Sequence, residues 1–381
     1  MNVPKLRFKE FNDEWCYQSL SKYVNRITTK NKNNESDLVL TISAQYGLVD
    51  QTIFFNRSVS SSNLTGYYLL NNGDFAYNKS YSNGYPWGAV KRLNKYNQGV
   101  VSSLYICFKT NNLIDSNFLE QYFETNKWYQ QISEVSVEGA RNHGLLNIAV
   151  NDFFNTKHYI PSIKEQEKIS KFLSLLDKKM ELQTKKIEDL KLFKKGLLYN
   201  EKRNNNLWNE YKISDIMNIT RGTVIPKTEI SECLNNEFRY PVYSSQTSNN
   251  GILGYDNKYD FNGKFLTWTT DGANAGKVFY REGKFRCTNV CGILYNKDNR
   301  YVSELTAELL NIETPKYVSY VGNPKLMNNV MSNIIIKLPD PSRDHFFSSI
   351  LKIINKKLTI EEEKLDKLFE LKKGLMQNMF V

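Results

Sequence analysis

The residues with the most distinctive chemistry in this chain are its cysteines and histidines. Cys287 and Cys291 form the one closely spaced cysteine pair, and His143, His158 and His345 all lie far from it in sequence. A zinc ion needs three or four such ligands at suitable spacing. The pair therefore predicts buried thiols in a strand rather than a metal site, and five scattered cysteines argue against a disulfide framework.

Two segments resemble catalytic motifs only in part. The run from Gly272 to Lys277 has three residues between its glycines and is followed by Val278, so it does not fit the phosphate-binding pattern GxxxxGK[ST]. Pro339-Asp340 lacks a downstream Glu-x-Lys at nuclease spacing, and the Asn/Asp-Pro-Pro-aromatic tetrapeptide of methyltransferases does not occur. We therefore expect a non-catalytic chain with no cofactor or metal of its own. Product formed by the chain alone would instead favour an unrecognised nuclease or modifying enzyme.

The chain is basic. Its 381 residues include 51 Lys plus Arg against 40 Asp plus Glu, which gives a net charge of +11 and a pI near 9.1. This balance favours a polyanionic partner or an acidic membrane surface. No apolar run approaches the ~18–20 residues of a membrane helix, and the charged start lacks the apolar core of a signal peptide. We therefore expect a cytoplasmic protein that does not engage a membrane.

Two groups of polar side chains could read a nucleic acid. Bases are read chiefly by Arg or Lys on guanine and by Asn or Gln on adenine, while phosphates accept bonds from any Lys, Arg or hydroxyl. Arg141 and Asn142 are the first choice as DNA contacts, because they lie between glycines in an expected exposed loop. Each residue taken singly can equally be a solvated loop residue, and His158 is expected to be structural. The candidates are Asn78, Lys79, Ser80, Tyr81, Lys91, Arg92, Arg141, Asn142 and His143 in the first half, and Thr269, Thr270, Asn274, Lys277, Arg281, Asn323 and Lys325 in the second.

A long internal repeat must position these groups. Residues 160–200 align with 338–378 without a gap, and both copies contain Lys-Lys-Gly-Leu near their ends. Each copy has an apolar stripe at 4-3 spacing on a charged background, which predicts a helix of about 36 residues whose stripe needs a partner. The stripes are Ile169, Leu173, Leu176, Met180, Ile187, Leu190 and Leu197, and Phe347, Leu351, Ile354, Leu358, Leu365, Leu368 and Leu375. We expect the two helices to form an antiparallel coiled coil; the alternative is that each packs on its neighbouring domain.

The repeat extends to whole modules. Trp15 and Trp208 each open a module, and short β-type runs with turn signals fill the space up to each helix. The expected fold class is α+β, with two mixed α/β domains, two long helices and an internal duplication. The expected boundaries are 1–158 and 201–337 for the domains, and 159–200 and 338–381 for the helices.

Taken together, these segments resemble the specificity subunit of type I restriction-modification enzymes. The resemblance rests on IPSIKEQEKI with the helix that follows it, on the second copy of that helix, on the PKLRFKEFNDEW opening, and on GDFAYNKS and TTDGANAGKV. It covers essentially the whole chain. One departure is that Glu165-Gln166 in the first copy is replaced by Arg343-Asp344 in the second, so the two helix starts need not make equivalent contacts.

The resemblance implies a function in DNA recognition. Each domain, as a target-recognition domain, would read one half of a bipartite, asymmetric sequence in double-stranded DNA, and the helices would set the spacer and dock two modification subunits. Those subunits would carry S-adenosylmethionine and methylate adenine, and restriction subunits using ATP and Mg would join them. The alternative is an autonomous sequence-specific DNA-binding scaffold or regulator that needs no partner.

Overall fold

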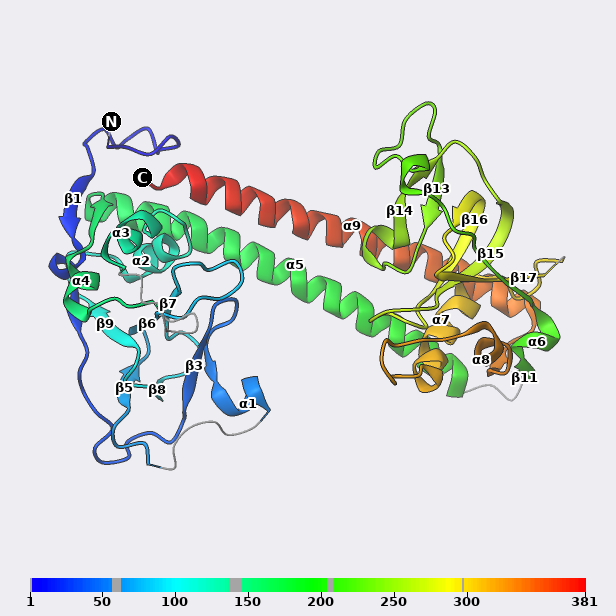
Figure 1. The fold of residues 1–381 in the computed structure, drawn as a ribbon, viewed down its shortest axis with the longest axis horizontal. Helices are drawn as coiled ribbons and strands as arrows, with labels where there is room; N and C mark the ends of the chain where they lie inside the picture. Colours follow the sequence, from blue (N-terminus) through cyan, green and yellow to red (C-terminus); the bar gives the residue numbers. More distant parts are fainter. Residues whose placement is uncertain (1, 57–62, 137–145, 204–207, 297) are drawn as a thin grey trace. The chain divides into compact units, whose positions relative to one another are not determined.

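A computed structural model describes residues 2–56, 63–136, 146–203, 208–296 and 298–381 (Figure 1). The chain forms two compact units. The first comprises Met1–Gln183 together with Lys364–Val381, and the second comprises Thr184–Glu363. Each unit therefore holds one domain and one part of each of the two long helices, α5 (Ile163–Arg203) and α9 (Pro341–Met379).

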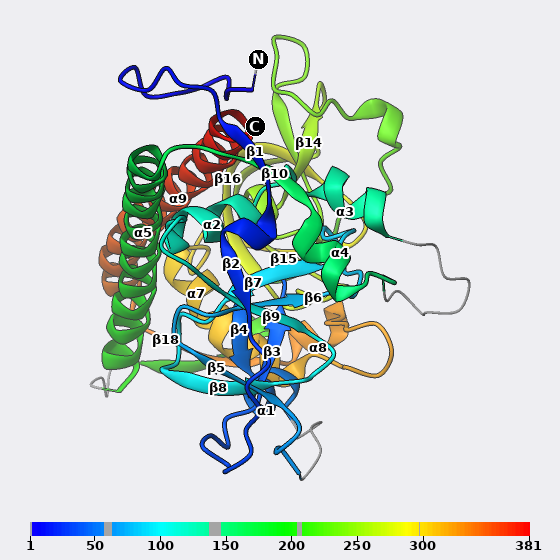
Figure 2. The same cartoon turned by 90° about the vertical axis from the view of Figure 1, so that its left-hand side faces the viewer.

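Four antiparallel strands form the main sheet of the first unit, and all four are labelled in Figure 2. In spatial order they are β2 (Val24–Arg26), β9 (Ile106–Thr110), β6 (Phe75–Asn78) and β7 (Ala89–Arg92). Three strand pairs accompany the sheet: β1 (Cys16–Ser19) with β10 (Lys157–Ile160), β3 (Leu40–Ser43) with β4 (Gly47–Asp50), and β5 (Tyr68–Asn71) with β8 (Gln98–Val101). The helices are α1 (Gln51–Phe55), α2 (Ser116–Phe123), α3 (Tyr129–Val135) and α4 (Val150–Asn155), with a 3-10 turn, η1, at Leu20–Lys22.

Six strands form the main sheet of the second unit. In spatial order they are β12 (Asn218–Arg221), β17 (Cys291–Tyr295), β15 (Phe261–Thr269), β16 (Val278–Cys287), β13 (Tyr240–Tyr243) and β14 (Ile252–Asp256), and only β13 and β16 are parallel. A separate pair joins β11 (Asn209–Lys212) to β18 (Ile335–Leu338). The helices are α6 (Ile213–Ile216), α7 (Glu304–Glu313) and α8 (Asn328–Ser332), with 3-10 turns η2 (Lys227–Glu229), η3 (Ser248–Gly251) and η4 (Thr314–Tyr317).

The two units repeat one arrangement. The order β2-β9-β6-β7 recurs as β12-β17-β15-β16, and in each unit the opening strand pairs with the strand that precedes the long helix. One helix is also repeated, since α2 and α7 both begin at a side-chain cap. The Asp115 carboxylate accepts from Phe118 N at 2.7 Å, and the Ser303 hydroxyl accepts from Thr306 N at 3.1 Å. The expected fold class, α+β with an internal duplication, is confirmed.

The register of the central strands corrects the sequence match by one residue. By letters alone, NNGDFAYN matches FNGKFLTW, which sets Phe75 beside Phe265. In the sheets, Phe75 lies opposite Phe108, and Leu266 lies opposite Leu294. Asn25 of β2 and Asn218 of β12 correspond, because each lies ten residues after the tryptophan that opens its module, Trp15 or Trp208. Phe108 and Leu294 are equivalent in turn, because each lies opposite the residue after that asparagine. The equivalent of Phe75 is therefore Leu266, and both side chains are fully buried.

The stripes of α5 and α9 are buried or half-buried along their length. Ile169 and Leu173 lie in the core of the first unit with the end of α9, and Phe347 and Leu351 lie in the core of the second. Leu176, Ile187, Ile354 and Leu358, nearer the middle of the helices, are also buried. The expected helix pairing and the alternative of packing on the neighbouring domain therefore both occur, at different places along each helix.

Polar contacts show that the helices run antiparallel within each unit. In the first unit, Lys372 Nζ near the end of α9 donates to Asp177 Oδ1 of α5 at 2.5 Å. In the second unit, Lys194 Nζ near the end of α5 donates to Asn355 Oδ1 of α9 at 2.7 Å. These are equivalent positions of the repeat. The buried Glu361, which interrupts the apolar stripe, pairs with Lys186 Nζ at 2.9 Å.

The two helix starts make partly equivalent contacts, which resolves the question raised by their different sequences. The Gln166 side chain accepts a bond from Asp115 N at 2.7 Å, and Asp344 accepts one from the Ser303 hydroxyl at 2.8 Å. Both thus bind the cap residue of the helix that follows the sheet. The neighbouring pair differs, since Glu165 forms an ion pair with Arg7 at 2.8 Å.

Within the described ranges, every helix is too short or too polar to cross a membrane.

Candidate nucleic-acid interface

Some of the predicted site residues lie where a central strand ends: Asn78 to Tyr81 at the end of β6, and Thr269 and Thr270 at the end of β15. After β6, Leu146 N donates to Lys79 O at 2.9 Å, and after β15, Leu326 N donates to Thr270 O at 2.9 Å. Lys79 and Thr270 are equivalent, because each lies four residues after the corresponding pair Phe75 and Leu266. A later segment of the chain therefore hydrogen-bonds to the same position of the sheet in both units. Loops at the end of a rigid central strand are well placed to hold variable residues in a fixed orientation.

In the first unit, three of the predicted residues line an open hollow of about 400 Å³. Asn78, Ser80 and Tyr81 lie there together, and the Asn78 carboxamide oxygen accepts from Ser80 N at 3.1 Å. Lys79 does not join them, because its Nζ donates to Ile148 O at 3.1 Å. The other lining residues were not among the sequence candidates. They come from the end of β3 and the turn after it, from α1, from the loop after β6 and from the start of β7: Ile42, Ser43, Ala44, Gln45, Tyr46, Phe54, Ser82, Asn83 and Ala89.

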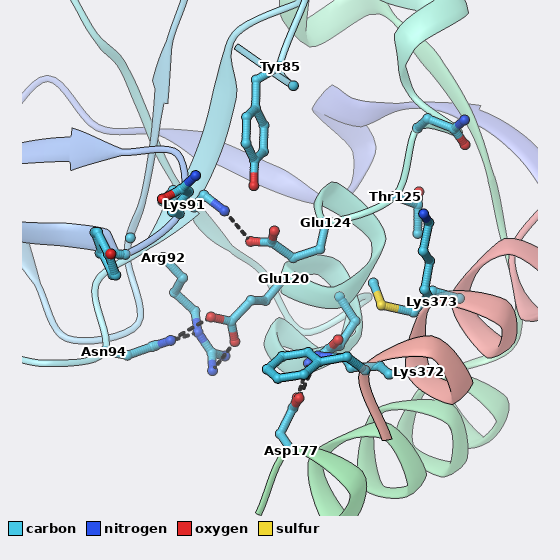
Figure 3. A pocket seen from close by; sticks show the side chains of 18 of the residues that line it. Tyr85, Lys91, Arg92, Asn94, Glu120, Glu124, Thr125, Asp177, Lys372 and Lys373 are labelled. Carbon is cyan, nitrogen blue, oxygen red and sulfur yellow. Dashed lines mark hydrogen bonds and ion pairs between the residues drawn. The ribbon is translucent and has the colours of Figure 1, made fainter. Parts of the chain in front are cut away.

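Lys91 and Arg92 point toward helix α2, as Figure 3 shows. Lys91 is buried and pairs with Glu124 at 2.5 Å, while Arg92 pairs with Glu120 at 2.6 Å. Burial raises the pKa of the Glu120 carboxyl, and Arg92 counteracts part of that rise. Each cation is thus matched by a carboxylate, which leaves less charge for a phosphate. The placement favours a structural role for both residues.

The same layer of charges continues onto the long helices. Figure 3 shows Asp177 of α5 and Lys372 of α9 beside the α2 carboxylates, and Asp177 also accepts from Gln121 Nε2 at 3.0 Å. A cavity of about 890 Å³ lies between these groups and the turn of the β3–β4 hairpin. Ion pairs, together with the hydrogen bond from Gln121 to Asp177, therefore join the sheet, α2 and both long helices of the first unit.

The leading sequence candidates, Arg141, Asn142 and His143, lie outside the described residues. His158 is described and buried. Its Nδ1 lies 2.8 Å from the Tyr122 hydroxyl and its Nε2 lies 2.8 Å from the Thr156 hydroxyl, and burial lowers its pKa to about 3. This agrees with the expected structural role.

In the second unit, the predicted residues divide into buried and exposed sets. Thr269 and Thr270 are buried, and the Thr270 hydroxyl donates to Asp271 at 2.6 Å. Asn274, Lys277, Asn323 and Lys325 are exposed. These four lie on two loops that hydrogen-bond to each other, since Gly272 N donates to Pro324 O at 2.9 Å. The exposed set remains a predicted DNA contact.

Arg281 differs from the other predicted residues of this unit. Its guanidinium is buried, lies 3.7 Å from the ring centre of Tyr243 and 4.4 Å from that of Phe279, and Nε donates to the Thr267 hydroxyl at 3.2 Å. Burial lowers its pKa from the usual value. Arg281 was predicted only as one of the candidate DNA contacts of the second half, and its burial on the sheet could not be read from the sequence.

The cysteine pair behaves as expected for buried thiols. Cys287 and Cys291 are both buried in the second unit, and the Cys291 thiol lies 3.8 Å from Ser244 O. A hydrogen bond from Cys287 lowers the pKa of Cys291, whereas burial raises the pKa of Cys287. Across the described residues, His, Cys, Asp and Glu side chains form no cluster of three or more that could hold a metal ion.

Comparison with known proteins identifies the class. The model of the type I restriction modification DNA specificity domain matches residues 205–370. The chain is 36% identical over 186 residues to the putative type I specificity subunit S.MpnORF201P of Mycoplasma pneumoniae, covering 47% of this chain and 74% of that protein. It is 47% identical over 125 residues to the N-terminus of the putative specificity subunit S.MpnORF289P of the same organism, covering 32% of this chain and 65% of that protein, less than two thirds of its length.

The fold has a solved counterpart. The crystal structure of a type I restriction-modification S subunit from M. genitalium superimposes with a TM-score of 0.67 at 15% identity, covering 100% of this chain and 99% of that one. At 15% identity, this match shows a shared fold and nothing further. The fold of this chain is thus a known architecture. The 36% identity to S.MpnORF201P, over 74% of that protein, shows that the chain belongs to the family of type I restriction-modification specificity subunits.

Proposed function

We propose that this chain is the non-catalytic DNA-reading subunit of a type I restriction-modification complex, with each unit reading one half of a bipartite, asymmetric target. One observation carries the proposal: the two units repeat the same sheet, cap and helix contacts, while the loops after β6 and β15 carry different side chains. A repeated scaffold holds the two loops in equivalent orientations. Different side chains on them read different bases.

The long helices set the distance between the half-sites and dock two modification subunits. Their equivalent contacts, Asp177 with Lys372 and Asn355 with Lys194, support two similar docking positions. The modification subunits supply S-adenosylmethionine and methylate adenine, and restriction subunits supply ATP-driven, Mg-dependent cleavage. The net charge of +11 supports a duplex as the partner of the assembled complex.

In this proposal the direct contacts in the first unit come from exposed Tyr81 and half-buried Asn78 and Ser80, and Arg141, Asn142 and His143 are kept as predictions. In the second unit they come from the exposed residues Asn274, Lys277, Asn323 and Lys325. Lys79, Lys91, Arg92, Thr269 and Thr270 hold the loops in place, because their polar groups bond within the protein or their side chains are buried.

The direct experiment is to map methylated adenines in a strain whose single specificity subunit is this chain. We expect one motif with two specified parts and an unspecified spacer. Replacing residues 209–335 with the corresponding domain of a relative should change one half only, and inserting residues into the 163–198 helix should change the spacer only. Methylation without sequence preference would refute the proposal, and tight specific binding by the isolated chain without modification subunits would favour an autonomous regulator.

A further inference from the structure

In each unit a hairpin adjoins the four repeated strands: in the first unit it lies outside the main sheet, and in the second it forms the last two strands of the sheet. In the first unit the β3–β4 hairpin lies next to β7, and in the second the β13–β14 hairpin lies next to β16, through the pairing of β13 with β16. β7 and β16 are equivalent strands. The two hairpins therefore occupy corresponding places, although neither contributed a residue to the predicted site.

The turns of these hairpins share a short pattern. The first runs Ser43-Ala44-Gln45 and ends at Gly47, and the second runs Ser244-Ser245-Gln246 and ends at Gly251. The two glycines have nearly the same positive φ, +79° and +80°, a conformation that glycine adopts without strain. We call residues 43–47 and 244–251 the first and second hairpin tips.

The first hairpin tip forms one wall of the 400 Å³ hollow that also contains Asn78, Ser80 and Tyr81. Gln45 is exposed, and the Tyr46 and Tyr81 rings are 62% and 60% exposed. The lining residues carry amides, hydroxyls and aromatic rings, and none of them is charged. In a chain of net charge +11, the positive charge that attracts phosphates therefore lies outside this hollow. Amides that can form two bonds to adenine, and exposed rings, suit base edges and faces.

The second hairpin tip presents amides in a fixed conformation. Asn249 and Asn250 are exposed and both adopt left-handed backbone angles, with φ of 48° and 51°. The Gln246 amide folds back onto Ile252 O. Beneath the tip, Arg281 stacks on Tyr243, and one of its terminal nitrogens lies 2.9 Å from the point that a Cβ on Gly251 would occupy. The buried guanidinium thus supports the tip backbone from below.

We propose that the two hairpin tips are specificity elements of the two half-sites: the first reads bases through Gln45 and the rings around the hollow, and the second through Asn249 and Asn250. This inference rests on the proposed function. Arg281 is a positioning residue for the second tip, not a contact to DNA.

The test measures which adenines are methylated, and how fast, by the complex of this chain with its modification subunits. Gln45→Ala should lower discrimination at one base pair of one half-site by about 5- to 150-fold, the range for a lost two-bond base contact. Gln130→Ala, which removes an exposed glutamine of α3, is the matched control and should leave the motif unchanged.

For the second tip, Asn249→Gly with Asn250→Gly removes both amides while keeping a residue that accepts positive φ. This double variant should relax the other half-site only. Asn299→Gly is its matched control, because Asn299 is also exposed and has a φ of 56°. Arg281→Lys should relax the same half-site as the double variant, and its effect should vanish when combined with that variant.

The outcomes of these experiments distinguish failure of the hairpin-tip proposal from failure of the proposed function. A two-part motif that keeps both halves unchanged in all tip variants would overturn this inference and leave the proposed function intact. A uniform loss of methylation at every site, without a change of motif, would also overturn it, since it would indicate phosphate or partner contacts. Absence of any two-part motif in the unaltered chain would refute the proposed function itself.

Discussion

At the scale of single residues, His158 shows how the first unit handles a titratable group in its core. The ring is buried, and both of its nitrogens lie within 2.8 Å of hydroxyls, from Tyr122 and Thr156. Because the ring is taken out of water, the charged form is disfavoured and the pKa falls to about 3. The folded protein therefore holds this histidine neutral throughout the physiological range.

This placement predicts a pH dependence of stability. In the unfolded chain the pKa of a histidine is about 6.5. Below that pH, His158 therefore binds a proton in the unfolded chain but not in the folded chain. The free energy of unfolding should fall by up to about 1.4 kcal/mol per pH unit from about pH 6.5 downward to about pH 3. Between pH 6.5 and 5, denaturant unfolding should show a loss of about 2 kcal/mol that His158→Gln lacks.

Exposed His345 supplies the control for this measurement. His345→Gln should retain the full pH dependence of the unaltered chain. Equal slopes for His158→Gln and the unaltered chain would show that His158 is protonated in the fold.

How much of the site the sequence could predict depended on the kind of residue. The chemistry of base reading selected Asn78, Ser80 and Tyr81, which the fold brings together. It also selected Lys91 and Arg92, because a lysine on the surface and one facing a carboxylate look alike in sequence. Gln45 was not among the candidates, since the hairpin that carries it lies beside this loop only in the folded unit.

At the scale of elements, the glycines of the two Lys-Lys-Gly-Leu segments do not end their helices. Helix α5 continues from Gly196 to Arg203, and α9 continues from Gly374 to Met379. A Cβ added at either glycine would meet nothing within 4 Å outside the helix's own turn. Each glycine therefore costs helix stability without a packing reason visible in the chain.

Replacing these glycines should stabilise the protein. Gly196→Ala and Gly374→Ala should each raise the free energy of unfolding by about 0.5–1 kcal/mol, because alanine loses less backbone entropy in a helix. Denaturant unfolding checks this. Gly47→Ala is the contrasting variant and should destabilise, since Gly47 has a φ of +79°. A loss of stability in the two helical variants would mean that the helices end near these positions.

The helices were the elements that the sequence predicted best. Their apolar stripes, repeated in two copies, already required two long helices with a buried face. The domains were predicted only in class, because short strands of mixed Tyr, Asn and Gly do not specify their order in a sheet. The repeated order β2-β9-β6-β7 and β12-β17-β15-β16 depends on long-range pairing that the letters do not contain.

At the scale of the whole molecule, the two units build their hydrophobic cores from separate sets of residues. Leu173 and Leu351 are equivalent residues of the repeat, both fully buried, and they belong to the cores of different units. Cutting either side chain back to alanine leaves a cavity and costs about 2–5 kcal/mol. Leu175 and Ile353, which are 61% and 70% exposed on the same helices, provide matched controls.

We expect the two core substitutions to act independently. Leu173→Ala and Leu351→Ala should each destabilise by about 2–5 kcal/mol, whereas Leu175→Ala and Ile353→Ala should change stability by less than about 0.5 kcal/mol. In calorimetry the double core variant should show the sum of the single effects within about 0.5 kcal/mol. A clearly smaller combined effect would reveal one cooperative core instead of two.

The one-residue offset between the central strands has a practical consequence for building chimeras. A crossover that joins the halves by matching letters would fuse β6 to β15 with Phe75 in the place of Phe265. Because side chains alternate between the faces of a strand, that junction would turn every following residue to the wrong side of the sheet. A junction that exchanges Phe75 for Leu266 keeps buried residues buried. We therefore expect recombination between the duplicated halves to yield a folded hybrid only when the junction aligns Phe75 with Leu266.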